Sequence, residues 1–189
     1  MSDDVFRLKA VANDLIARAW RADEEMGVDR LHYLCFFAQG WAAAVHGRAL
    51  MDELPEARPH GLRYRGLVEE YGDQPGRIDR LARIVERRLR RRTSTPALPA
   101  GHWAEEAIDR VWDTYGGLTE AGLVMEALRH NHPWAATRDA NPGIANPTVP
   151  FALMRDHYRA IAEAERARHV AARRARLRLV ASDGIAIAS

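Results

Sequence analysis

The sequence is poor in several residue types, and each scarcity excludes a class of protein. One cysteine, Cys35, among 189 residues excludes an internal disulfide and gives no sign of a disulfide-stabilised secreted domain. The opening segment MSDDVFRLKA is polar and lacks the apolar core of a signal peptide. The longest uncharged run, 31–47, is shorter than the roughly 20 apolar residues of a membrane-spanning helix. We therefore expect a cytoplasmic protein without a membrane span.

Lysine is also nearly absent, since Lys9 is the only one and almost every cation is an arginine. The net charge is only +2, so the chain as a whole is not strongly basic. Its 47% hydrophobic and 29% charged residues are ordinary for a globular protein with a real core. Length and composition predict one main domain, with or without an appendage.

Apolar residues recur with a helical period through most of the chain. The pattern predicts an amphipathic helix over about 4–24 and an apolar helix over about 29–46, with Asp29 as its N-cap. Further helices are expected at 62–71, 75–89, 103–115, 119–130 and about 149–176. The predicted fold is therefore mainly α: one compact domain around a buried central helix at about 29–46, with minor β pieces near 48–60.

The C-terminal segment RLRLVASDGIAIAS carries two conflicting signals. Leu177 and Leu179 alternate with arginines, Ile185 and Ile187 alternate with alanines, and Asp183-Gly184 lies between them. Alternation on both sides of Asp-Gly favours a β-hairpin. The competing interpretation continues the preceding helix to about Ala181.

Cys35 and the histidines are the residues that suggest chemistry. His32 and Cys35 are three apart on the apolar helix and could meet, but a thiol between Leu34 and Phe36 is expected to be inert. The same apolarity speaks against use of this helix as a DNA-recognition helix. We interpret this apolar helix as the centre of the hydrophobic core.

The segment RHNHPW offers His130 and His132, for which no third metal ligand has suitable spacing. We expect a helix end at Pro133, with Trp134 packed as an anchor. The adjacent pairs Glu69-Glu70 and Glu105-Glu106 should diverge on their helices and face solvent. No catalytic group, cofactor site or metal site is therefore predicted.

Two Arg-rich runs are the most distinctive feature. The first, expected as a helix over 77–92, contains Arg87, Arg88, Arg91 and Arg92; the second lies at 165–178. Either could bind nucleic-acid phosphates or an acidic protein surface. An acidic protein is favoured because the net charge is small and no aromatic residues lie among the arginines. We place a partner-binding site at Arg87, Arg88, Arg91 and Arg92.

The segment RLHYLCFFAQGWAAAVHGRALMDELPEARPHG resembles the opening signature of the Panacea antitoxin family, and LTEAGLVMEALRHNHPW resembles a later segment of that family. The matching positions of both segments, and of the close of the pattern, are Tyr33, Phe37, Ala38, Gln39, Gly47, Leu50, Glu53, Glu56, Ala57, Gly61, Leu128, His130, Pro133, Trp134, Ile144 and Tyr158. The similarity spans roughly 8–162. It implies a Panacea-like antitoxin domain over 1–165, followed by an Arg-rich helix end and tail over 166–189, either within that domain or appended to it. Leu62 stands where the family has proline, and Arg30 and His32 replace a Lys-Leu pair.

The resemblance implies a non-enzymatic bacterial antitoxin that binds and neutralises a cognate toxin protein. The chain is most similar to the stand-alone SocA-type branch, whose members are proteolytic adaptors that deliver the toxin to a ClpXP-like protease. The implied partners are thus the toxin and a ClpX-type unfoldase. The alternative function is a nucleic-acid-binding regulator that uses the Arg-rich helices 77–92 and 165–178.

Overall fold

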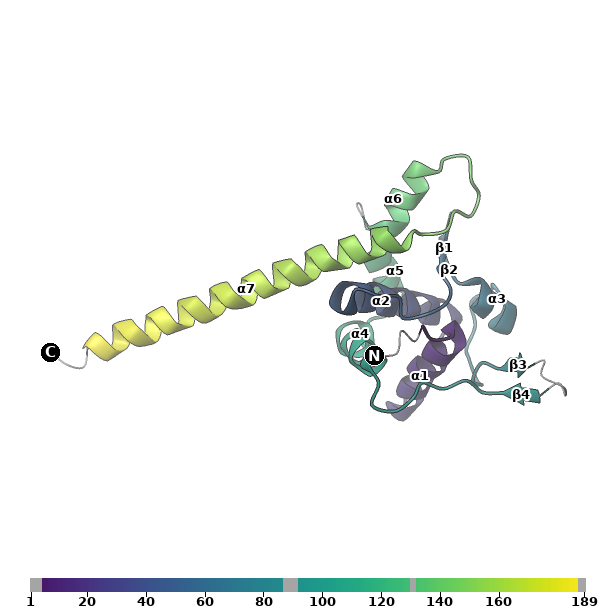
Figure 1. Ribbon diagram of the computed structural model, residues 1–189, viewed down its shortest axis with the longest axis horizontal. Helices are drawn as coiled ribbons and strands as arrows, with labels where there is room; N and C mark the ends of the chain where they lie inside the picture. The colour runs from purple at the N-terminus through teal and green to yellow at the C-terminus, as the bar shows by residue number, and fades with distance from the viewer. Residues whose placement is uncertain (1–4, 87–91, 130–131, 187–189) are drawn as a thin grey trace.

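The computed structural model of the protein describes residues 5–86, 92–129 and 132–186, and the side chains described exclude those of residues 85, 86, 92 and 174–186. Helices dominate these residues, and only two short strand pairs accompany them (Figure 1). The elements in chain order are α1 (Leu8–Arg21), α2 (Val28–His46), β1 (Glu56–Arg58), β2 (Gly61–Arg63), α3 (Arg65–Tyr71), β3 (Ile84–Glu86), β4 (Arg92–Ser94), α4 (Trp103–Tyr115), α5 (Glu120–Ala127), α6 (Pro133–Ala140) and α7 (Phe151–Ala186).

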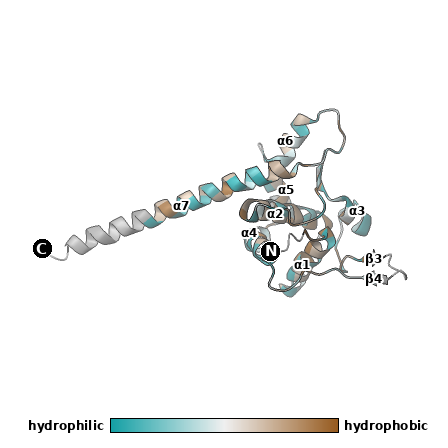
Figure 2. Ribbon diagram, in the orientation of Figure 1, coloured by the Kyte–Doolittle hydropathy of each residue, from teal (hydrophilic) through white to brown (hydrophobic). Residues whose placement is uncertain are grey.

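Helix α2 is the centre of the fold, as the sequence predicts. Its residues from Leu31 to Ala43 are all buried, including Tyr33, Phe37 and Trp41. A helix that is apolar on every side must be covered on every side. Helices α1, α4, α5 and α7 all pack against it, and most hydrophobic residues of α1 and α2, two strongly hydrophobic helices in Figure 2, belong to the buried core. The prediction of a mainly α fold around a buried central helix is confirmed.

The starts of the first two helices differ from the prediction: α1 begins later, and α2 has a different N-cap. Phe6 pairs with the chain after α2, because its N–H donates to the Leu50 carbonyl at 2.9 Å, so α1 starts only at Leu8. The Asp52 carboxylate accepts the Leu8 N–H at 2.9 Å and satisfies one donor at the helix end. Asp29 is not the N-cap of α2: Gly27 is, and Asp29 pairs with Arg63 at 2.5 Å in the first turn.

Of the β pieces predicted near 48–60, β1 lies in that range, whereas its antiparallel partner β2 lies just beyond it, so the helix predicted over 62–71 begins only at Arg65. Ala57 of β1 faces Leu62 of β2, and both are buried. The loop before α7 covers the other edge of β1, since the Ala57 N–H donates to the Pro147 carbonyl at 2.7 Å. Pro133 does not end the preceding helix: α5 ends at Ala127, and Pro133 begins α6, where its fixed φ suits the first turn.

The helix predicted over 75–89, which overlaps the Arg-rich helix expected over 77–92, is wrong in its described part, and residues 87–91 of these ranges lie outside the described residues. Its described part is irregular from Arg77 to Arg83 and then forms β3, which pairs with β4. The buried side chain of Asn13 donates to the carbonyls of Ala82 and Pro96 and accepts the Ala82 N–H at 2.7 Å. The Ile78 N–H donates to Met26. These partners bind the backbone groups that a helix would use internally.

The C-terminal hairpin is also wrong, because α7 runs without a break from Phe151 to Ala186. Met154, Tyr158 and Ala162 bury its first half against the body, and this packing supplies the nucleus from which a helix extends residue by residue. An isolated two-stranded hairpin has no such support and is marginal in water. The second half of α7 projects away from the body (Figure 1).

Candidate partner-binding site

The residues that carry the sequence resemblance connect elements of the fold. Gln39 is fully buried, and its Oε1 accepts the N–H groups of Leu50 and Met51, both at 3.0 Å. These bonds hold the segment that follows Gly47, whose left-handed φ of 71° ends α2. One glutamine in the central helix thus fixes the path of the chain toward β1.

Tyr33 and Gly61 form a second connection. Gly61 starts β2 with a φ of 143°, and a Cβ there would come closer than 3.0 Å to the Tyr33 hydroxyl. Only glycine combines this backbone with so close an approach. Leu62, which replaces the family's proline, is buried in the β1–β2 pair and leaves the turn a regular antiparallel connection.

Phe37 and Trp134 complete the set by packing and hydrogen bonding. The Phe37 ring stacks on Tyr115 with 4.3 Å between ring centroids. Trp134 is half-buried, and its indole N–H donates to the Arg58 carbonyl at 3.0 Å, so its predicted role as an anchor is confirmed. Pro133 is buried beside it, whereas His130 lies outside the described residues. These residues hold α2, the β1–β2 pair and α6 together.

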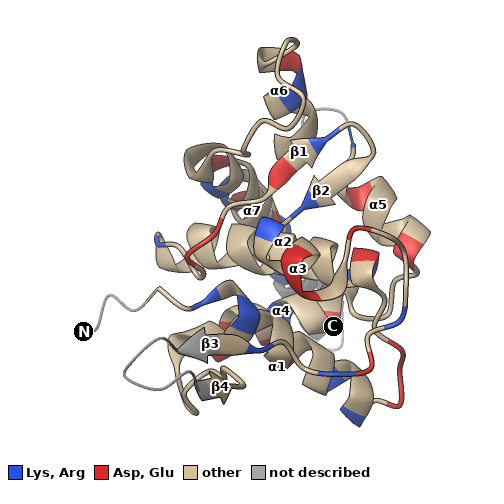
Figure 3. Ribbon diagram, turned by 90° about the vertical axis from the view of Figure 1, so that its right-hand side faces the viewer, with Lys and Arg blue, Asp and Glu red and all other residues tan. Residues whose placement is uncertain are grey.

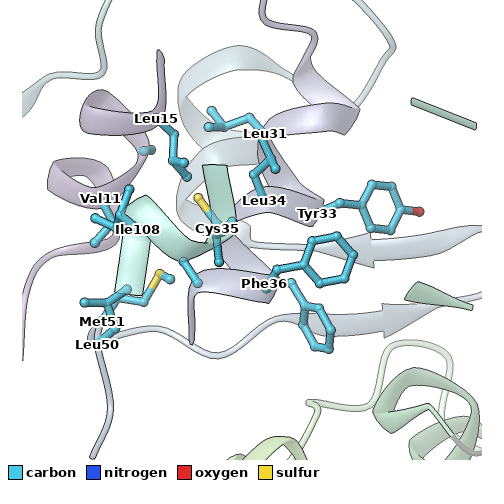
Figure 4. Packing of buried hydrophobic residues seen from close by; sticks show 14 of the residues in the cluster. Val11, Leu15, Leu31, Tyr33, Leu34, Cys35, Phe36, Leu50, Met51 and Ile108 are labelled. Atoms are coloured by element: carbon cyan, nitrogen blue, oxygen red, sulfur yellow. The ribbon is translucent and has the colours of Figure 1, made fainter. Parts of the chain in front are cut away.

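Cys35 and His32 do not form a reactive pair. Cys35 has no exposed surface, and burial raises its thiol pKa, with Glu53 adding to the effect. Figure 4 shows it inside the buried cluster with Val11, Leu15 and Ile108. The Nδ1 of His32 instead accepts the Tyr64 N–H at 3.0 Å, and burial, helped by the charges of Arg63 and Arg58, lowers its pKa to about 3. The prediction that Cys35 lies in the core is confirmed.

His132 is the second buried histidine. It packs against Phe36, His157 and Tyr158, with a centroid distance of 4.7 Å to His157. Burial, then the charges of His157 and Arg129, lowers its pKa to about 3, so the ring is neutral near pH 7. Among the described residues, no group of three or more His, Cys, Asp or Glu side chains is placed to hold a metal ion.

The solvent-facing interpretation of the glutamate pairs is right for Glu69 and Glu106 and wrong for Glu70. The side chains of Glu69 and Glu106 are 64% and 73% exposed. Glu70 is only 10% exposed and pairs with Lys9 at 2.6 Å and with Arg80. Burial acts to raise the pKa of Glu70, but the hydrogen bonds and charges of Lys9 and Arg80 outweigh it and lower the pKa. Glu70 therefore ties α3 to α1 and to the segment before β3.

Of the four predicted binding residues, only Arg92 belongs to a described element. Arg87, Arg88 and Arg91 fall outside the described residues, between β3 and β4 in sequence, and Arg92 is the first residue of β4. Beside the β3–β4 pair lies a depression of about 400 Å³. It is lined by Val5, Phe6, Arg7, Ala10, Ile84, Pro96, Ala97 and Pro99. Val5 is 50% exposed at its rim. The surrounding face, formed by α1, α3 and the two strand pairs, carries intermixed charges (Figure 3).

The sequence analysis did not predict the structural roles of two residues, Gly40 and Asn13. Gly40 lies where α7 crosses α2, and the only sequence signal is an isolated glycine within a helical pattern. Asn13 holds the segment before β3, and its one signal is a polar residue on a mostly apolar helix. Both roles depend on partners that are remote in sequence.

The second Arg-rich run forms the projecting half of α7. Every residue from Arg166 to Arg173 is exposed. None of the described helices is long and apolar enough to cross a bilayer.

Comparison of the chain with models of protein families, with curated proteins and with solved structures found no match.

Proposed function

We propose that the protein is a non-enzymatic antitoxin that binds and neutralises a cognate toxin protein. The observation that carries the proposal is the ordered Panacea-like pattern, several of whose residues make contacts between elements of the fold. Gln39, Tyr33 and Trp134 each hold a different segment against the central part of the fold. A pattern that specifies a scaffold suits a family whose members share a fold and recognise partners through their surfaces.

The chemistry of the buried groups supports a binding role over catalysis. The Cys35 thiol lacks the electropositive, partly exposed setting that a nucleophile requires. His32 and His132 have pKa values of about 3, far below the range in which a general base works near neutral pH. Each group is enclosed by the core and is unavailable to a substrate.

The toxin-binding site of this proposal is the β3–β4 pair together with the adjacent depression. The apolar walls formed by Ile84, Pro96 and Val5 could receive an aliphatic or aromatic anchor from the partner. Arg87, Arg88, Arg91 and Arg92 are proposed to bind acidic groups of the toxin, because guanidinium groups bind carboxylates in a bidentate manner. Specific protein interfaces combine an apolar centre with a polar rim.

Co-expression with the product of the neighbouring gene tests the function. The antitoxin should restore growth of cells that express a toxic neighbour, and the purified proteins should form a complex. Glutamate substitutions at Arg87, Arg88 and Arg91 should weaken that complex while thermal unfolding stays unchanged. Glutamate substitutions at Arg77, Arg129 and Arg159, which are exposed and lie outside α1, α3 and the two strand pairs, provide a control of equal charge. A harmless neighbour that does not bind would refute the proposed function.

The adaptor role is a separate part of the proposal. A ClpXP-like protease should degrade the purified toxin faster when this protein is present, and the protein itself should not be consumed in proportion. Neutralisation with no change in the rate of toxin degradation would establish sequestration in place of delivery.

A further inference from the structure

In the second half of α7, the side chains that the structure describes face solvent. The last contacts with the body are made by Ala162, which is buried, and by Glu165, which pairs with Arg110 at 2.5 Å. Arg110 in turn lies 3.9 Å from the centre of the Trp41 ring and fixes this point to the central helix. From Arg166 onward the described side chains are exposed. We call residues 166–182 the arm.

The charge of the arm differs sharply from that of the body. It contains Arg166, Arg168, Arg173, Arg174, Arg176 and Arg178, together with His169, and no aspartate or glutamate. The net charge of +2 for the whole chain conceals this segregation. Two arms side by side would repel each other, so pairing with a second copy is disfavoured. A partner that binds the arm must therefore be strongly anionic.

The distribution of the arginines around the helix selects the type of anion. Successive residues turn by about 100° around a helix axis, so the six arginine positions leave no gap wider than about 80°. An acidic groove on a protein would contact one side of the arm and leave several arginines facing away from it. A nucleic-acid groove has phosphates along both walls, and the major groove of B-DNA, about 12 Å wide, admits a helix of about 10–12 Å diameter.

We infer that the arm is a nucleic-acid-binding helix that contacts the phosphate backbone on both sides of a groove. The arm spans about 25 Å at 1.5 Å per residue, long enough to follow one groove across several base pairs. Alanines between the arginines keep the helix slim and strongly helix-forming. The β3–β4 pair, which flanks the first Arg-rich run, lies on the far side of the body, so the arm acts without it (Figure 1). The inference is independent of the proposed antitoxin function.

Fluorescence anisotropy of the full chain with labelled double-stranded DNA and, in parallel, double-stranded RNA tests the inference and distinguishes the two sources of phosphate. With six phosphate contacts, affinity should fall about 10³-fold between 50 and 200 mM salt. Glutamine at Arg166, Arg168 and Arg173 should weaken binding and make the slope of log affinity against log salt shallower by about 3.

The matched control carries glutamine at Arg21, Arg65 and Arg77, which removes the same charge from exposed positions on the body. This variant should retain most of the affinity and the salt slope of the parent. Equal losses in the two triple variants, or no binding to either nucleic acid at about 50 mM salt, would overturn the inference. Salt-dependent binding to poly-glutamate, with none to nucleic acid, would assign the arm to an acidic protein.

Discussion

Gly40 of α2 lies so close to Tyr158 of α7 that a Cβ at position 40 would come within 3.0 Å of three atoms of the tyrosine ring. The ring cannot withdraw easily, because it is 1% exposed and packs edge-on against Trp41 and Phe36. The contact sets how closely the two helices approach. It therefore fixes the direction in which the arm leaves the body.

Gly40→Ala should destabilise the protein by about 1–3 kcal/mol, the usual cost of overpacking a core. This loss outweighs the gain of up to about 1 kcal/mol expected when alanine replaces glycine within a helix. Urea unfolding monitored by circular dichroism measures the change. Gly122→Ala in α5 is the control, since its Cβ would make ordinary contact, 3.4 Å from the Thr119 hydroxyl, and should be neutral or stabilising. Equal stability of both variants would show that α7 sits further from α2.

The Tyr33–Gly61 contact allows a double-mutant cycle. Gly61→Ala should cost more than 2 kcal/mol, because the new Cβ meets the Tyr33 hydroxyl and because alanine tolerates a φ of 143° poorly. In a Tyr33→Phe background the hydroxyl is gone, and the nearest remaining ring atom would lie at 3.5 Å. The Gly61→Ala cost should then fall by about 1 kcal/mol or more, measured as a coupling energy. Strict additivity would contradict the contact.

The features that the sequence predicts are those whose signals are local. The central helix follows from an apolar run that is too short to span a membrane and too apolar to face water, and its observed bounds, Val28–His46, differ by one residue at the start. The inert state of Cys35 follows from its neighbours in the same way. Local pattern and tertiary context agree in this part of the chain.

The failures occur where remote partners or helix propagation decide the outcome. Ile78, Leu81 and Val85 have helical spacing, yet Asn13 and Met26 take up the backbone groups of that segment. The alternation around Asp183-Gly184 is a valid hairpin signal, yet α7 propagates through it from a packed nucleus. The binding residues Arg87, Arg88 and Arg91 remain a prediction.

Removal of the chain after Glu165 should leave the body intact. The described side chains of the arm are exposed, so the free energy of unfolding should change by less than about 0.5 kcal/mol, as for surface changes. Truncation after Ala160 is the comparison, because it also removes Ile161, the buried Ala162 and the partner of Arg110. That shorter chain should be clearly less stable in urea. A large loss already at Glu165 would indicate that the arm packs on the body in solution.

The two buried histidines should make the protein acid-sensitive above the range in which carboxylates titrate. Their pKa values of about 3 lie below the ordinary value of about 6.5, so below pH 6.5 the unfolded chain binds protons that the folded chain does not. Stability therefore falls as pH falls from about 6.5 toward 3. Between pH 7 and pH 5 each histidine should cost about 2 kcal/mol.

His132→Phe isolates one of these contributions. Phenylalanine fills the apolar site beside Phe36 and Tyr158 and cannot bind a proton, so the loss of stability between pH 7 and pH 5 should shrink by about 2 kcal/mol. Burial raises the pKa values of Glu53 and Glu120, but their contributions to the pH dependence are the same in the parent and the variant and cancel in the comparison. Thr137→Val, which removes the nearby hydrogen bond to the Pro133 carbonyl, should lower stability equally at both pH values. An unchanged pH dependence in His132→Phe would mean that His132 reaches solvent and titrates in the folded protein.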